Sequence, residues 1–148
     1  MGLPSIRRHG LIGTVILLLS FAAAAAQQPP AMLGAADGAA IRRAITDQMA
    51  AFGRNDGAAA FGYASPTIRE MFRTPEIFMA MVKSGYQPVY RPRHVEFGII
   101  DTEDGQPTQH VLVTGPDGTV VEALYFMEHE KDGRWLINGC VLKPSYQA

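Results

Sequence analysis

Residues 111–142 read VLVTGPDGTVVEALYFMEHEKDGRWLINGCVL, and this stretch decides the fold. Two turn signals interrupt it, Gly115-Pro116-Asp117-Gly118 and Lys131-Asp132-Gly133, and both contain the residue types that tight turns favour. The segments between the turns are rich in β-branched and aromatic side chains, as strands are. Three strands are predicted: one beginning at Val111, a long one over 119–130, and a last one over 134–142 with Trp135, Ile137 and Val141 on one face. Short turns between consecutive strands predict an antiparallel meander.

The residues before this stretch add a fourth strand and a segment at the sheet edge. Val95, Phe97 and Ile99 alternate with polar or small residues, which is the period of a half-buried strand. Pro88 and Pro92 flank further β-branched residues and predict a short extended segment at the edge of the sheet, where proline is tolerated.

The residues before the strands predict helices. Apolar side chains recur at three- and four-residue steps on one helical face, with Asp37 as the N-cap and Gly53 as the stop, and they are Ile41, Ile45, Met49 and Phe52. Three short helices follow, with start signals at Asp56, Ser65-Pro66 and Thr74-Pro75, and the last ends at Gly85. A hydroxyl cap followed by proline is favoured, because the hydroxyl accepts a free backbone N–H and proline has none to satisfy.

Helices followed by an antiparallel meander make an α+β fold, with the helices packed on a curved sheet. This order of elements permits a cone with an internal cavity. Whether the cone is hollow depends on how its side chains pack, so the element order leaves that question open.

The N-terminus has the pattern of a cleaved secretory signal. Arg7 and Arg8 precede an apolar run over 11–21, and Ala24-Ala25-Ala26 provides a small-residue cleavage site. The apolar stretch 11–26 is shorter than the ~20 residues that a membrane-spanning helix needs. The expected organisation is a signal peptide over 1–26, a linker over 27–36 and a single domain over 37–148. We therefore expect the protein to be exported to the periplasm or the medium, by general secretion in preference to the twin-arginine route. The alternative is an uncleaved anchor that holds the same domain at the membrane.

Composition excludes some classes of function. The chain has 148 residues and a formal net charge of −1, and losing residues 1–26 removes two arginines and no acid, so the mature charge is −3. Nucleic-acid binding needs a basic face and is disfavoured. Cys140 is the single cysteine, so an internal disulfide is excluded, and it is interpreted as a small side chain packed on a strand. No metal motif or phosphate-binding loop is present in the sequence, so no cofactor is expected.

Several segments resemble a bacterial family known as domain of unknown function 4864 (DUF4864). They are Ile41-Arg42-Arg43-Ala44-Ile45, Ala64-Ser65-Pro66-Thr67-Ile68-Arg69, Pro88-Val89-Tyr90, Ala123-Leu124-Tyr125-Phe126-Met127 and Asp132-Gly133-Arg134-Trp135-Leu136-Ile137-Asn138-Gly139-Cys140. The resemblance covers nearly all of the mature chain. It implies a cone-shaped fold similar to nuclear transport factor 2 and SnoaL-type proteins. It implies no activity or catalytic residues, since such folds host both enzymes and binding modules.

Candidate site residues follow from their chemistry. Glu128, His129 and Asp101 are the candidate bases of a small isomerase or lyase, which needs a carboxylate or imidazole in an apolar pocket. Tyr63, Tyr125 and Asn138 are the candidate ligand-binding residues. His94 and Glu96 form a weak two-residue pair, and a stretch of basic side chains would suit an anion if they converge: Arg69, Arg73, Lys83, Arg91, Arg93 and His94.

Two classes of function remain from the sequence. The favoured one is a non-enzymatic module that binds a small apolar or anionic molecule in the cone, or pairs through its sheet with a second copy or another protein. The alternative is a small isomerase or lyase that uses a carboxylate or His129. The candidate residues cannot be placed within hydrogen-bonding reach of each other by sequence reasoning, so binding is preferred to catalysis.

Overall fold

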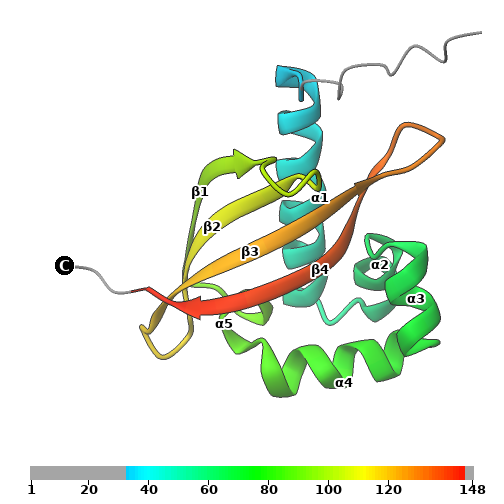
Figure 1. Ribbon diagram of the computed structural model, residues 1–148. Helices are drawn as coiled ribbons and strands as arrows, with labels where there is room; N and C mark the ends of the chain where they lie inside the picture. Colours follow the sequence, from blue (N-terminus) through cyan, green and yellow to red (C-terminus); the bar gives the residue numbers. More distant parts are fainter. Residues whose placement is uncertain (1–32, 146–148) are drawn as a thin grey trace, which may run out of the picture. The chain divides into compact units, whose positions relative to one another are not determined.

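The computed structural model describes residues 33–145 (Figure 1). Its sheet contains four strands in the order β1-β2-β3-β4, with every neighbouring pair antiparallel. The strands are β1 (His94–Asp101), β2 (Thr108–Thr114), β3 (Val120–His129) and β4 (Trp135–Pro144). The predicted meander is therefore confirmed, and both predicted turns join its strands, with Gly118 and Gly133 at positive φ. The predicted signal segment lies outside the described residues.

Five helices precede the sheet within residues 33–145, and this order confirms the α+β fold. They are α1 (Ala35–Gly53), α2 (Gly57–Gly62), α3 (Pro66–Phe72), α4 (Pro75–Gly85) and α5 (Gln87–Tyr90). The side-chain oxygens of Asp56, Ser65 and Thr74 accept backbone N–H groups at the starts of α2, α3 and α4, as the sequence predicts. None of the helices within residues 33–145 is both long enough and apolar enough to cross a membrane.

Asp37 does not precede α1, and that prediction is wrong. The helix begins at Ala35, and the Asp37 carboxylate reaches back one turn to accept the backbone N–H of Gly34 at 3.0 Å. Its other oxygen accepts the indole N–H of Trp135 at 3.1 Å. These two hydrogen bonds hold the pKa of Asp37 below its usual value. Asp37 therefore ties the first turn of α1 to the start of β4.

The predicted extended segment around Pro88 is also wrong over residues 87–90, which form the single turn α5. The backbone N–H of Tyr90 donates to the carbonyl of Tyr86 at 2.9 Å, as in a helix. Pro88 lies in the first turn, where a missing N–H costs no hydrogen bond. The turn buries Val89 in the core between α1 and the sheet, and it buries Tyr90 among apolar side chains of the helices.

A bulge in the β3–β4 pair reverses the alternation of the last strand. Phe126 pairs with Gly139, whereas Met127 pairs with Ile137, so Asn138 is an extra residue on β4. Ile137 faces the core, but Val141 is 43% exposed, and the prediction that both share one face is wrong. A second irregularity, between Phe97 and Ile100, leaves Ile99 exposed.

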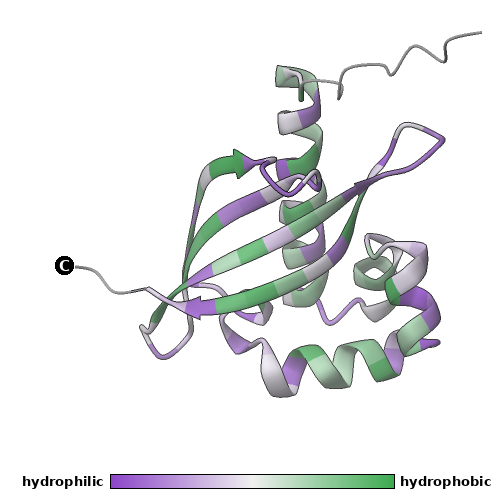
Figure 2. Cartoon of the chain, viewed as in Figure 1, coloured by the Kyte–Doolittle hydropathy of each residue, from purple (hydrophilic) through white to green (hydrophobic). Residues whose placement is uncertain are grey.

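The main core lies between α1 and one face of the sheet (Figure 1), and Figure 2 shows apolar residues in both of these layers, interspersed with polar ones. Ile41 and Ile45 of α1, with Val111 and Val113 of β2, are fully buried there. A second cluster of aromatic and apolar side chains joins the end of α1 to α2, α4 and α5.

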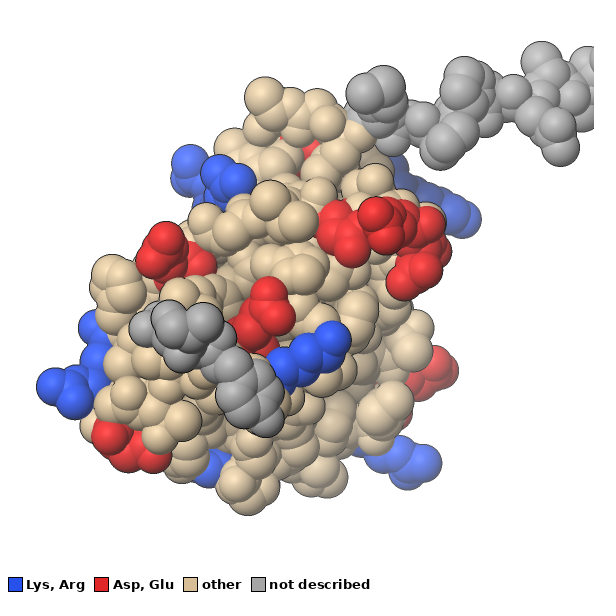
Figure 3. All heavy atoms as spheres, turned by 60° about the vertical axis from the view of Figure 1, so that its left-hand side comes forward, with Lys and Arg blue, Asp and Glu red and all other residues tan. Residues whose placement is uncertain are grey.

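The opposite face of the sheet is in contact with solvent, and Figure 3 shows broad uncharged areas on it with charged groups between them. The imidazole Nδ1 of His110 and the carboxylate of Glu122 lie 2.8 Å apart on neighbouring strands of this face. Pairing of two copies through the sheet stays a prediction.

Candidate functional site

A pocket of about 400 Å³ opens between the helices and the β3–β4 part of the sheet. Its wall consists of side chains from α1, α3, α4, α5 and the two strands, together with the segment that joins α2 to α3. The lining residues are Gln48, Phe52, Ala64, Ile68, Met71, Phe72, Phe78, Met81, Val82, Tyr86, Val89, Tyr125, Ile137, Gly139 and Cys140. All of these side chains are apolar or neutral. The pocket therefore suits a molecule that is mostly apolar.

Tyr125 and Cys140 form a cross-strand pair in the wall of the pocket on the sheet side. Tyr125 is 1% exposed, and its hydroxyl has no hydrogen-bond partner among the described residues. The Cys140 thiol lies beside this hydroxyl and, after burial, is the main cause that raises the pKa of Tyr125. The Tyr125 hydroxyl is thus a buried polar group whose neighbour is a thiol, a weak hydrogen-bonding group.

Two other polar side chains in the wall are already engaged. The Gln48 carboxamide N–H donates to the carbonyl of Ala60 at 3.1 Å, which ties α1 to α2. The Tyr86 hydroxyl donates to the backbone carbonyl of Cys140 at 3.0 Å, which ties the end of α4 to β4. These hydrogen bonds help to fix the shape of the pocket. The Tyr125 hydroxyl makes no comparable hydrogen bond to the described residues.

The titratable groups of the wall are held in their neutral forms. Burial raises the pKa of Tyr125 well above its usual value and raises the pKa of Tyr86 as well. Burial also raises the pKa of the Cys140 thiol to about 12. A thiol with that pKa carries almost no thiolate at neutral pH, so Cys140 is unsuited to nucleophilic catalysis.

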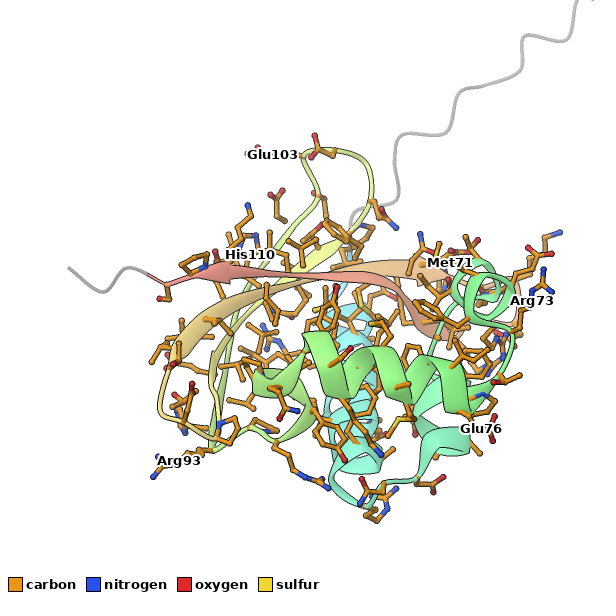
Figure 4. The ribbon with its side chains drawn as sticks, turned by 90° about the horizontal axis from the view of Figure 1, so that it is seen from below. Met71, Arg73, Glu76, Arg93, Glu103 and His110 are labelled. Carbon is orange, nitrogen blue, oxygen red and sulfur yellow. The ribbon has the colours of Figure 1, made fainter. Side chains whose placement is uncertain are left out.

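The α3 side of the pocket is only lightly packed. Helix α3 contains no buried residue, and Met71, which lines the pocket, is 66% exposed. Figure 4 shows Met71 and Arg73 at this end of the molecule, whereas His110 lies beyond the sheet. Arg73 ends the helix with φ of 67°, a conformation that favours glycine over a branched or long side chain.

The start of α3 is firmly attached to β4. Ser65 is fully buried; its backbone N–H donates to the carbonyl of Ile137 at 2.8 Å, and its hydroxyl donates to the Asn138 side chain at 2.7 Å. The backbone N–H of Ile137 in turn donates to the carbonyl of Tyr63 at 2.8 Å. Helix α3 is therefore held at its first turn, and its remaining residues are partly buried or exposed.

The structure separates the three candidate ligand-binding residues. Tyr125 lines the pocket, as described above. Asn138 accepts the Ser65 hydroxyl and supports the α3 attachment instead of lining the pocket. Tyr63 lines a different groove, between the first half of α1 and the β3–β4 turn, near Asp47 and Arg43.

The three candidate bases lie outside the pocket lining. His129 is exposed at the end of β3 and stacks on Trp135 with ring centroids 4.6 Å apart. Asp101 ends β1, where its carboxylate accepts the backbone N–H of Glu103 at 2.7 Å. Loss of solvent contact is the main cause that raises the pKa of Glu128, and the nearby Glu130 raises it further. Their catalytic roles stay predictions.

The basic side chains do not gather at one described site. Arg91 donates to the carbonyl of Phe52 at 2.8 Å and stacks on the Tyr90 ring, and Lys83 lies 5.9 Å from the centre of the same ring. Arg73 and Arg93 lie far apart in Figure 4. His94 and Glu96 are both exposed on β1, but the close histidine–carboxylate contact joins His110 to Glu122. Within residues 33–145, no three acidic, histidine or cysteine side chains are grouped as metal ligands.

Sequence reasoning missed Tyr86 as a wall residue. It also passed over a signal at Gln48, which lies three residues after Ile45 and four before Phe52 on the apolar face of α1. A polar residue at such a position indicates either a buried hydrogen bond or a functional group. Tyr86 gives no comparable signal, because its contact with β4 joins residues 54 positions apart.

The comparison with protein families matches residues 34–148 to the family described as "Domain of unknown function (DUF4864)". No curated protein and no solved structure matches the chain.

Proposed function

This chain belongs to the DUF4864 family, and on that premise we propose that it is an exported, non-enzymatic protein that binds a small apolar or amphipathic molecule. The observation that carries the proposal is the pocket of about 400 Å³ with its apolar and neutral lining. A pocket of this size is within the range of small-molecule sites. Burial of apolar ligand surface contributes about 25 cal/mol per Å², which is sufficient for useful affinity without any ionic contact.

The chemistry of the lining supports binding over isomerase or lyase activity. Proton abstraction from carbon needs a carboxylate or imidazole within hydrogen-bonding reach of the substrate. The titratable side chains in the lining are instead Tyr86, Tyr125 and Cys140, and burial keeps each of them protonated.

Export rests on the sequence of the N-terminus. If the signal is removed after Ala26, the protein isolated from the envelope of its host will begin at Gln27. Intact mass spectrometry under denaturing conditions measures this directly. A retained N-terminus would mean that the domain is anchored to the membrane by its uncleaved N-terminal segment. The same sample under native conditions will report any bound molecule and the mass of a dimer.

Filling the pocket is expected to weaken ligand binding. Val82 of α4 is 4% exposed and lines the pocket, so the ring in Val82→Phe will occupy part of its volume. We expect about tenfold weaker binding of the neutral fluorescent probe N-phenyl-1-naphthylamine, which corresponds to about 1.4 kcal/mol. Overpacking strain is expected to cost about 1–3 kcal/mol of stability as well, so unfolding must be measured for the same sample.

The matched control is Val141→Phe, which adds the same ring at a position that is 43% exposed and does not line the pocket. This variant is expected to bind the probe as the wild-type protein does. Equal probe affinity in a folded Val82→Phe variant and in the control would place binding outside the pocket and would overturn the proposal.

A further inference from the structure

Helix α3 covers one side of the pocket, although little apolar surface holds it there. Its residues Ile68, Met71 and Phe72 line the cavity, and none of the residues of this helix is buried. The Phe72 ring contacts the ring of Phe78 on α4, with centroids 5.7 Å apart. Figure 1 shows α3 at the rim of the molecule, outside the layers formed by α1 and the sheet. An element with so few buried apolar groups is among the first to open locally.

The start of α3 is a fixed point. The buried Ser65 is tied to β4 by its backbone N–H, which donates to the carbonyl of Ile137 at 2.8 Å, and by its hydroxyl, which donates to Asn138 at 2.7 Å. The same hydroxyl accepts the backbone N–H of Ile68 at 3.2 Å and so orients the first turn of the helix. A displacement of α3 would therefore turn about Ser65 and move the far end of the helix.

The far end of α3 is a strained joint. Arg73 has φ of 67° and ψ of −43°, and across it the backbone N–H of Thr74 donates to the carbonyl of Phe72 at 2.8 Å. These values describe the γ-turn with positive φ, which is rare and strained. Glycine adopts such a conformation without a clash, whereas the Cβ atom of arginine makes it unfavourable. Arg73 is exposed, at the periphery of the molecule in Figure 4.

Two opposing contributions act on the position of α3. The contact of Phe72 with Phe78 favours the closed position seen in the structure. The backbone of Arg73 favours any position that lets this residue return to a common conformation, because strain persists only where the surrounding structure enforces it. An element under such opposing contributions can populate two positions.

We propose that α3 is a gate of the pocket, which opens by turning about Ser65 while Arg73 relaxes, and which closes again over a bound ligand. The inference rests on the proposed function, because it names how a ligand reaches that pocket. It also has a consequence that needs no ligand. Cys140 lines the pocket and is the single cysteine of the chain, so opening of the gate will expose its thiol to reagents in solution.

The test uses two variants that differ only at the joint. Arg73→Gly and Arg73→Ala both remove the guanidinium, but only glycine removes the Cβ atom that makes the γ-turn unfavourable. Two rates are measured in each variant: labelling of Cys140 by the neutral reagent 4,4′-dithiodipyridine, and release of N-phenyl-1-naphthylamine in stopped flow. We expect both rates to be about fivefold lower in Arg73→Gly, because relief of strain favours the closed position more than the flexibility of glycine favours the open one.

The matched control is the pair Arg54→Gly and Arg54→Ala. Arg54 also follows the last residue of a helix, but its φ is −91°, which is ordinary for any residue, and it does not line the pocket. Glycine relieves no strain at this position, so it is not expected to slow either rate relative to alanine.

The dependence of labelling on urea separates the gate from global unfolding. Opening of α3 alone exposes little surface, so the labelling rate of the wild-type protein is expected to be nearly constant at low urea concentrations. Labelling through global unfolding would instead rise steeply with urea, because the whole domain exposes its surface.

The outcomes separate the gate from the proposed function. Equal rates in the two Arg73 variants, or labelling that rises with urea as steeply as global unfolding does, would overturn the gate while binding in the pocket stands. If N-phenyl-1-naphthylamine does not bind the wild-type protein, the proposed function is overturned, and the labelling rates still decide whether α3 opens. Circular dichroism checks that all four variants are folded.

Discussion

Replacing Phe52 with alanine is expected to lower the free energy of unfolding by about 3–5 kcal/mol, which is a large part of the about 5–15 kcal/mol that holds a typical domain together. Phe52 is 2% exposed, and its ring lies 6.1 Å from that of Phe78 and 6.3 Å from that of Tyr90, measured between centroids. Removing the ring would leave a cavity where the end of α1 meets α4 and α5. Urea unfolding followed by circular dichroism measures the loss.

The control for this prediction is Phe72→Ala. Phe72 also contacts Phe78, with centroids 5.7 Å apart, but it belongs to α3 and is only partly buried. We expect it to cost roughly half as much, because less apolar surface returns to water. Similar losses for the two variants would mean that α3 is packed more tightly than its exposure indicates.

Replacing Arg91 with alanine is expected to lower the free energy of unfolding by about 2–3 kcal/mol, although this side chain is only partly buried. One guanidinium nitrogen donates to the carbonyl of Phe52 at 2.8 Å, near the end of α1, and another donates to the Asn55 side chain at 3.2 Å. The guanidinium also lies 4.4 Å from the centre of the Tyr90 ring. Hydrogen bonds from a charged group and stacking on an aromatic ring together account for this magnitude.

Arg91→Lys is the informative control. Lysine keeps the charge, but it lacks the planar fork that reaches two acceptors while stacking on the ring. We therefore expect lysine to recover less than half of the stability that alanine loses, as measured by the shift of the urea midpoint. Full recovery would mean that charge alone stabilises the end of α1.

The sequence predicted the features that depend on neighbouring residues. The caps at Ser65 and Thr74 and the turn that contains Gly118 depend on hydrogen bonds and dihedral angles within four residues, so residue type alone indicates them. The single turn α5 was missed because proline suits both an edge segment and the first turn of a helix.

The bulge at Asn138 and the pocket depend on contacts between distant residues. A Cβ atom at Gly139 would approach the Phe126 ring to 3.2 Å, so the shift in register accompanies a close contact between β3 and β4. Tyr125 was a candidate by residue type, but only the packing of the surrounding elements shows that its hydroxyl is without a partner. Element order did not determine whether the space between the helices and the sheet was filled.

The attachment of Ser65 to Ile137 and Asn138 has a consequence for the order of assembly. The hydroxyl contact joins positions 73 residues apart, and β4 is the last strand of the sheet. The ribosome makes a chain from its N-terminus, so α3 exists long before the strand to which it attaches. The wall of the pocket to which α3 and β4 both contribute is therefore complete only after the C-terminal strand has joined the sheet.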